Sequence, residues 1–446
     1  MQISKIVEQY NLIPIQLLYP SKKYRYTCVL ENALDLKEDF IYFPFVLKKD
    51  EIFDNIFEAM SNPHCKGFVI NIDYLKREEF INKFHILMKS QYKNIEVLLL
   101  AKNLYNTAFF IGERLTQKFE NLQVITVSGT QNTSCAVQML SDSMKNKIKI
   151  TKTEYSWDIY QKALEPILMA DKNTKYAIVE AIPERKHLFM FIKNYRKNNI
   201  IYLKTEPSYI DIWGEVEALS DEFAKLLDIP ANIKSIYSLS ENEIINRQIS
   251  YKMQNKLYFV KTNSKNEFKQ DFYYLNDCYK LVSEFLIQNK IRPIKSKKFF
   301  EANGLYGVLR IRQNDYFILN PEKFFLKPIK ETLKLFFNLN LNKQKIVIIE
   351  TFSGANNLYK ETVYKDLFAY IAGLNPDVLI LLGKNPYIKF YKMKNKNTYV
   401  KIFPFKSGNT SNERNVQLFL DGIKTNNASI YVASADNTSY IFDRNM

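Results

Sequence analysis

The stretch 125–140, "ITVSGTQNTSCAVQML", has the form of a phosphate-binding loop. Its apolar start predicts a buried strand, the small residues predict a tight turn, and the rest predicts an amphipathic helix. Such a loop holds phosphate through backbone N–H groups, a helix N-terminus, a lysine, and a hydroxyl that ligates magnesium. The hydroxyls are present here and the lysine is missing, so the loop is either an unusual nucleotide site or a structural remnant of one.

Outside this stretch, short apolar runs alternate with helical patterns along most of the chain. We expect strands at 67–72, 97–101, 124–127, 176–179, 199–203, 345–349 and 377–382, and a helix in "GEVEALSDEFAKLL" from residue 214. This alternation predicts an α/β fold with largely parallel sheets. A chain of 446 residues exceeds one ordinary core, and we expect three domains, at residues 1–118, 119–302 and 303–446.

The bulk composition argues against several classes of protein. Lys and Arg exceed Asp and Glu by 63 to 47, but the basic residues are scattered, so we do not expect a nucleic-acid function. The four cysteines lie far apart without C-x-x-C spacing, which favours reduced thiols over a zinc site. No apolar window reaches the roughly 18 residues of a membrane span, and no signal peptide is evident, so we expect a soluble, cytoplasmic protein.

The middle block resembles the ATP-binding domain of the Mur ligases, the ATP-dependent amino-acid ligases of peptidoglycan assembly. "VITVSGTQNTSCAVQML" resembles their strand, G-T-N-G-K-T-T/S loop and helix, and "ALEPILMA" resembles their G-x-P-L-x-L-L segment. "KYAIVEAI" resembles the strand that ends in a metal-binding glutamate, here Glu180. The nearest pattern is the D-alanyl-D-alanine-adding member.

Segments outside the middle block extend the resemblance over nearly the whole chain. "LDLKEDFIYFPF" and "DNIFEAMSNPHCKGFVIN" look like the domain that holds the uridine nucleotide, and "KQKIVIIETFSG" and "NPDVLILLG" resemble the C-terminal domain. The resemblance implies a three-domain architecture with a central P-loop-type domain of mainly parallel sheet and a Rossmann-like C-terminal domain.

The resemblance also implies the site residues. It places cofactor-binding positions at Gly129, Thr130, Asn132, Thr133, Ser134 and Asn320, and metal ligands at Ser134 and Glu180. The second loop glycine of the family falls at Asn132, which we expect to resist the positive φ that glycine accepts freely. The loop lysine falls at Thr133, which carries no charge.

Further departures concern the other catalytic positions of the family. Its metal histidine falls at Tyr209, and its carbamylated lysine falls near Asp221 or Phe223, with Lys225 close by on a different face or height of the helix. Its D-D-S-Y-N-A-N-P loop aligns with "NDYFILNP", which leaves Asp315, Asn320 and Pro321 matched. Its D-S-R signature is replaced by Leu30, Glu31 and Asn32.

Three hypotheses follow, of which a basic surface binder of nucleic acid or anionic polymer is the least favoured. The favoured one is a degenerate Mur-ligase-like protein that has lost amide ligation and acts as a binding or scaffold pseudoenzyme in cell-envelope or glycan metabolism. Its catalytic residues are unknown, it has no certain cofactor, and ATP and Mg²⁺ are expected only if activity remains. The expected partner is an enzyme of envelope or glycan synthesis, or a small anionic ligand held between the domains.

The competing hypothesis is an active ATP-dependent carboxylate–amine ligase that acts on a divergent substrate through an acyl phosphate, with Lys204 or Lys225 serving the phosphates. The site residues also have structural interpretations. Gly129 and Ser134 suit a tight turn with an N-cap, Glu180 suits a surface carboxylate, and Cys135 suits a buried, inert thiol.

Overall fold

The computed structural model describes most of the chain. The described residues are 25–45, 51–71, 78, 82–83, 86, 97–101, 103–130, 132–153, 159–183, 187–203, 216–240, 242, 246–247, 249, 256–260, 273–296, 298, 306–311, 314–319, 326–338, 344–350, 357–382, 388, 391, 398–403 and 428–433. The chain forms two compact units, of which the first contains two sheets and the second contains one.

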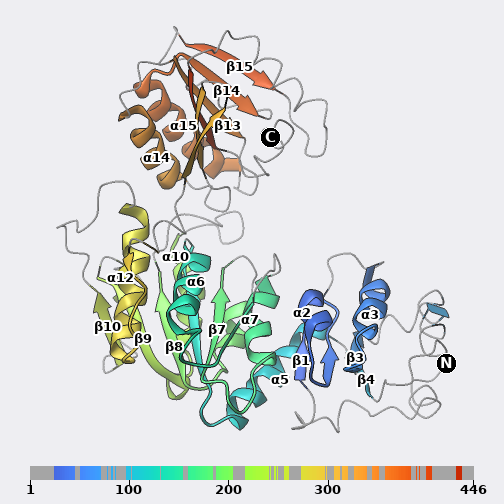
Figure 1. Ribbon diagram of the computed structural model, residues 1–446. Coiled ribbons are helices and arrows are strands. Elements are labelled where there is room, and N and C mark those ends of the chain that lie inside the picture. Colours follow the sequence, from blue (N-terminus) through green and yellow to red (C-terminus); the bar gives the residue numbers. More distant parts are fainter. Residues whose placement is uncertain are drawn as a thin grey trace. The chain divides into compact units, whose positions relative to one another are not determined.

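The first sheet, at the N-terminal side of the first unit, has the strand order β1-β2-β3-β4, and its neighbouring strands are parallel (Figure 1). Its strands are β1 Arg25–Thr27, β2 Phe40–Tyr42, β3 Cys65–Asn71 and β4 Val97–Ala101. Helices α2 Leu30–Asp35 and α3 Ile52–Met60 lie between the first three strands in sequence. The buried face of α3, with Phe53 and Ile56, packs in one apolar core with Phe40 and Phe68 from the strands.

The central sheet has the strand order β10-β9-β8-β5-β7-β6, and its neighbouring strands are also parallel. Its strands are β5 Gln123–Ser128, β6 Ile150–Lys152, β7 Tyr176–Ala181, β8 Asn198–Tyr202, β9 Ile233–Leu239 and β10 Leu257–Val260. After β5 the chain continues to β6 on one side, whereas after β8 it continues to β9 on the other side. The adjacent strands β5 and β8 therefore form a topological switch point, where open α/β sheets place their ligand sites.

Helices accompany the central strands as expected for crossover connections. They are α5 Leu104–Lys118, α6 Thr133–Met144, α7 Ile159–Leu168, α8 Leu188–Ile192, α10 Val216–Ala224 and α12 Tyr273–Gln288, with 3₁₀ turns at Lys225–Leu227 and Pro230–Asn232. Every residue of β7 is buried, which explains why the central strands read as continuous apolar runs rather than as alternating ones.

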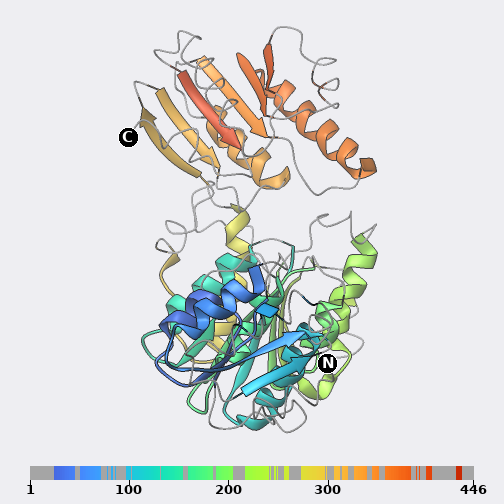
Figure 2. The ribbon, with the colours of Figure 1, turned by 90° about the vertical axis from the view of Figure 1, so that its right-hand side faces the viewer.

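The second unit contains a mixed sheet of order β11-β12-β16-β13-β14-β15, in which only the β11–β12 pair is antiparallel (Figure 2). Its strands are β11 Tyr306–Ile311, β12 Asn314–Leu319, β13 Gln344–Glu350, β14 Val378–Leu382, β15 Tyr399–Phe403 and β16 Ala428–Ala433, and its helices are α14 Leu326–Asn338 and α15 Asn357–Leu374. The predicted α/β fold class, with mainly parallel sheets and a Rossmann-like C-terminal part, is confirmed.

One expectation for this unit is wrong. "NDYFILNP" was expected to match a loop, but its first six residues form β12, and Asp315 pairs with Arg310 of β11 in the ladder. The continuous run Tyr316–Leu319, rich in aromatic and branched side chains, suits a strand better than a loop. Asn320 and Pro321 lie outside the described residues.

Helix α7 ties the first sheet to the central sheet through a buried carboxyl group. Glu165 is fully buried and accepts hydrogen bonds from the Thr27 hydroxyl at 2.5 Å, the Cys28 backbone N–H at 2.7 Å and the Cys28 thiol at 2.6 Å. One turn earlier, the Gln161 amide donates to the backbone carbonyls of Cys28 at 3.0 Å and Phe45 at 3.3 Å. Gln161 and Glu165 therefore satisfy backbone and side-chain groups of the first sheet, most of them at the carboxyl end of β1.

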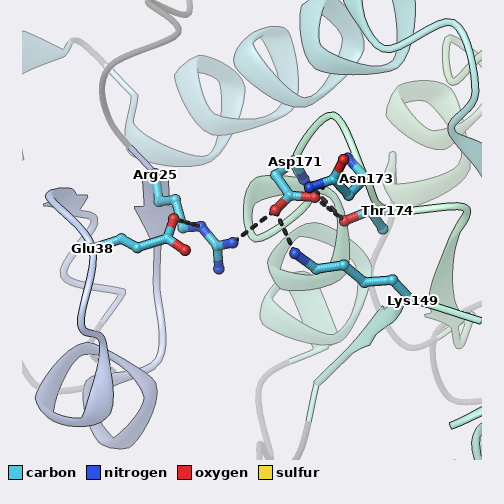
Figure 3. A network of polar contacts seen from close by, with 6 residues as sticks. All are labelled: Arg25, Glu38, Lys149, Asp171, Asn173 and Thr174. Carbon is cyan, nitrogen blue, oxygen red and sulfur yellow. Dashed lines mark hydrogen bonds and ion pairs between the residues drawn. The ribbon is translucent and has the colours of Figure 1, made fainter. Parts of the chain in front are cut away.

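A second connection between the two sheets is ionic (Figure 3). The Arg25 guanidinium, on β1, lies 2.7 Å from a Glu38 carboxylate oxygen and 2.9 Å from an Asp171 oxygen. Asp171 also accepts hydrogen bonds from Lys149, from the Thr174 hydroxyl and from a backbone N–H two residues further on. Burial alone raises the pKa of Asp171, but these hydrogen bonds and the charge of Lys149 outweigh it and lower the pKa from 3.8 to about 2.

This lowered pKa predicts a pH-dependent contribution to stability. Because the folded-state pKa lies below the unfolded value, the contribution is complete above about pH 4 and is lost as the pH falls towards about 2. The shift, discounted for solvent screening of a partly exposed group, corresponds to about 1 kcal/mol. Urea unfolding of the wild type and of Asp171→Asn should therefore differ most near neutral pH. A difference that stays constant down to about pH 2 would contradict the assignment.

Candidate functional site

The turn after β5 begins with a glycine that its surroundings require. Gly129 has φ +147°, and a Cβ on it would lie 2.8 Å from the Cβ of Leu203, the residue that follows β8. The Leu203 backbone N–H donates to the Ser128 carbonyl at 2.8 Å, so the two chain segments touch at this point. Glycine is therefore needed here both for its backbone conformation and for the close approach of Leu203.

Asn132 occupies the second glycine position of the loop and adopts φ +60°, in the left-handed region. The expectation that it would resist positive φ is wrong, because asparagine is among the non-glycine residues that tolerate this region best. It is the N-cap residue of α6, its carbonyl accepts from the Ala136 N–H at 3.0 Å, and the helix begins at Thr133. The N-cap therefore lies at Asn132 and not at Ser134.

The two hydroxyls that begin α6 point to Glu180 at the end of β7. Thr133 Oγ1 donates to Glu180 Oε1 at 2.6 Å, and Ser134 Oγ donates to the same oxygen at 2.8 Å. Thr133, at the position of the family's loop lysine, is buried, whereas Ser134 is exposed. Glu180 itself is only 6% exposed, so the interpretation of Glu180 as a surface carboxylate is wrong.

A lysine that sequence reasoning missed completes this cluster. The Lys162 ammonium, from the first turns of α7, lies 3.1 Å from Glu180 Oε2. Its side chain is 21% exposed and that of Glu180 is 8% exposed, so the pair is largely shielded from water. No local motif marks Lys162, because its partner Glu180 lies on β7, which is distant from it in the sequence. The one signal in the sequence is a lysine placed just before the "ALEPILMA" segment.

The cluster of Ser134, Glu180 and Lys162 does not suit a magnesium ion. Magnesium needs oxygen ligands in near-octahedral order at about 2.1 Å. Glu180 Oε1 is engaged by two hydroxyls and Oε2 faces an ammonium, which would repel a divalent cation. Among the described residues, no three His, Cys, Asp or Glu side chains gather to hold a metal ion.

The other predicted positions around this cluster are structural where they are described. Phe223 is buried and makes an edge-to-face contact with Tyr202, with 4.9 Å between the ring centroids. It is therefore a core residue and not an equivalent of a carbamylated lysine. Lys225 is ion-paired with the neighbouring Glu222 and does not serve as an unengaged phosphate lysine. Thr130 and Cys135 are buried at the loop and in the first turn of α6. Tyr209 and Lys204 lie outside the described residues.

Comparison of the sequence with protein-family models and with curated proteins gives no match. Solved structures do match in fold. MurF from Acinetobacter baumannii aligns with a TM-score of 0.66 at 10% identity, covering 93% of this chain and 91% of that one. MurF ligase from Thermotoga maritima, solved with ADP, aligns with a TM-score of 0.62 at 11% identity, covering 96% and 98%.

A third structure extends the likeness beyond murein. A pseudomurein peptide ligase type C from Methanothermus fervidus aligns with a TM-score of 0.55 at 12% identity and covers 95% of this chain and 98% of that one. These alignments span nearly the whole length of both chains, so the predicted Mur-ligase architecture is confirmed at the level of the fold. Among the described residues, no helix has the length and apolar character to cross a membrane.

Proposed function

Because this chain has the fold of the Mur ligases, we propose that it is a binding or scaffold protein that uses this architecture without its ATP-dependent amide ligation. Ligation of this kind makes an acyl phosphate on a carboxylate, which an amine then attacks. The transferred phosphoryl group is anionic throughout, so the reaction depends on concentrated positive charge around it. The proposal rests on how this chain arranges charge at the phosphate loop.

The observation that carries the proposal is the closed cluster around Glu180. The loop position that needs a lysine holds Thr133, whose hydroxyl is used on Glu180. The nearby ammonium of Lys162 faces the same carboxylate, so the pair contributes little net charge towards a phosphate. Removing a single preorganised charge-stabilising group typically costs about a hundredfold to a thousandfold in kcat. Losing the loop lysine and the magnesium together would cost more.

The ligand or partner follows from the chemistry of the fold and of the loop. The likeness of fold covers nearly the full length of the chain, which supports retention of a binding role. The partner we propose is an enzyme of cell-envelope or glycan synthesis, because the structures of like fold include one named as a pseudomurein peptide ligase. A small anionic ligand that meets the N-terminus of α6 is the other form of this proposal.

One observation favours the second candidate function, an active carboxylate–amine ligase. The loop keeps its backbone form at Gly129 and Asn132, and it is followed by a twelve-residue helix with no acidic residue in its first turn. Lys162 also supplies a cation near the loop. An active enzyme would need Lys162 to turn from Glu180 to a phosphate when nucleotide binds.

Release of ADP from ATP separates the two functions. We expect the purified protein, with ATP and magnesium and with mixed amino-acid and peptide amines, to form ADP no faster than Glu180→Gln does. That rate should lie at least about a thousandfold below an ordinary kcat of about 10 s⁻¹. ADP release well above that of Glu180→Gln and Ser134→Ala would establish the ligase function instead.

A further inference from the structure

We propose that the Lys162 ammonium takes the place of a divalent cation at Glu180, so that this site excludes magnesium. Both oxygens of the Glu180 carboxylate are engaged, one by the hydroxyls of Thr133 and Ser134 and the other by Lys162. A metal at Glu180 would have to displace the ammonium or lie beside it. The carboxylate needs one counter-charge, and the protein itself supplies it.

The position of Lys162 is fixed by its helix. On α7, Gln161 and Glu165 make five hydrogen bonds, four of them to Thr27 and Cys28 at the end of β1 and one, from Gln161, to the Phe45 carbonyl. Lys162 lies between these two anchors in the sequence, so the helix cannot shift without breaking them. The backbone of Lys162 is therefore held beside β7, and its ammonium reaches Glu180 from this fixed point on the helix.

Burial strengthens the exclusion. The Glu180 side chain is 8% exposed and the Lys162 side chain 21%, so water screens little of the repulsion between the ammonium and an incoming cation. A magnesium ion also gives up its hydration shell reluctantly and binds by preference where several oxygens are available. In this cluster the available oxygen ligands are the two hydroxyls and one carboxylate, and the carboxylate is already neutralised.

Binding of Mn²⁺ alone, followed by its electron paramagnetic resonance signal, tests this inference without any reaction. We expect the wild type to bind no Mn²⁺ at Glu180 and Lys162→Met to gain one site at least about tenfold tighter than any in the wild type. Adding Glu180→Gln to that variant should remove the gained site. Lys162→Gln, which keeps a hydrogen-bond donor next to Glu180, is the second variant should Lys162→Met fail to fold.

Lys193→Met is the matched control. Lys193 is also ion-paired at 3.1 Å, with Asp228, and its side chain is 17% exposed. The Lys193→Met substitution therefore removes the same charge from the same unit and leaves the loop unchanged. An equal gain of Mn²⁺ binding in Lys193→Met would show a general effect of net charge and overturn the inference.

Mn²⁺ binding to the wild type and to Glu180→Gln also tests the inference, without any lysine variant. Tight Mn²⁺ binding to the wild type that disappears in Glu180→Gln would show that Lys162 does not exclude the metal. A folded Lys162 variant that gains no site would overturn the inference as well. This inference concerns the site of the proposed function but fails separately from it, because ATP turnover tests the function and Mn²⁺ binding tests the lysine.

Discussion

Replacing Glu165 with alanine is expected to lower the free energy of unfolding by about 3–5 kcal/mol. The Glu165 side chain is fully buried on α7 and accepts from the Thr27 hydroxyl, the Cys28 N–H and the Cys28 thiol. Without it, a buried backbone N–H and a buried hydroxyl lose their acceptor, and a cavity opens between α7 and the end of β1. Both losses act at the connection between the two sheets of the first unit, so we expect the first sheet to become the less stable part.

Urea unfolding followed by circular dichroism measures this effect, with Glu284→Ala as the control. Glu284 lies on α12, where it accepts from the Gln288 amide at 2.8 Å in an exposed i, i+4 pair. Its removal should change stability by no more than about 0.5 kcal/mol. Equal effects of the two substitutions would mean that the buried Glu165 cluster does not stabilise the fold.

Replacing Gly129 with alanine is expected to cost about 2–4 kcal/mol, the second largest effect. At φ +147° an alanine is strained whatever space surrounds it, and its Cβ would lie 2.8 Å from the Cβ of Leu203. The chain at Leu203 is held by its hydrogen bond to Ser128, so neither segment moves away without losing contacts. The clash would therefore occur at the topological switch point between β5 and β8 of the central sheet.

Asn132→Gly is the matched control for the loop, because it removes a side chain at φ +60° instead of adding one. Glycine accepts this conformation without strain but is more flexible when unfolded, so we expect a change within about 1 kcal/mol of either sign. Thermal unfolding of both variants gives the comparison. A Gly129→Ala protein as stable as the wild type would refute the tight packing of the turn against Leu203.

Much of the fold was predictable from the sequence, because the central strands of parallel sheets are long apolar runs. The strands expected at 67–72, 97–101, 124–127 and 176–179 all exist, as do those at 199–203, 345–349 and 377–382. The short or edge strands carried no such signal. β1 has three residues, and β15, "YVKIF", leaves Tyr399 and Ile402 exposed, so neither forms a continuous apolar run.

The site was predictable only in part. The order of strand, small residues and helix revealed the loop, and the position of Glu180 after a buried strand led to the carboxylate. The balance of charge around Glu180 could not be predicted from the sequence, because it depends on which helix packs beside β7. Lys162 and Glu180 meet only after α7 has packed against β7. The αL conformation of Asn132 was misjudged because its energetic cost is small for asparagine.

These contacts explain how the turn of the loop is retained although the positive charge at the site comes from Lys162 on α7 and not from a lysine in the loop. Gly129 and Asn132 preserve the turn, and Thr133 and Ser134 direct their hydroxyls at Glu180. Thr133, in place of a loop lysine, and Lys162 on the neighbouring helix together close the cluster around Glu180. In the proposed account, the site carries its own counter-cation.

Calorimetric titration of the wild type with ATP, with and without magnesium, tests the central claim most directly. If Lys162 is the cation of this site, magnesium should add no saturable binding that depends on Glu180, whether ATP alone binds weakly or not at all. Saturable binding that requires magnesium and disappears in Glu180→Gln would contradict the account and would favour the ligase function.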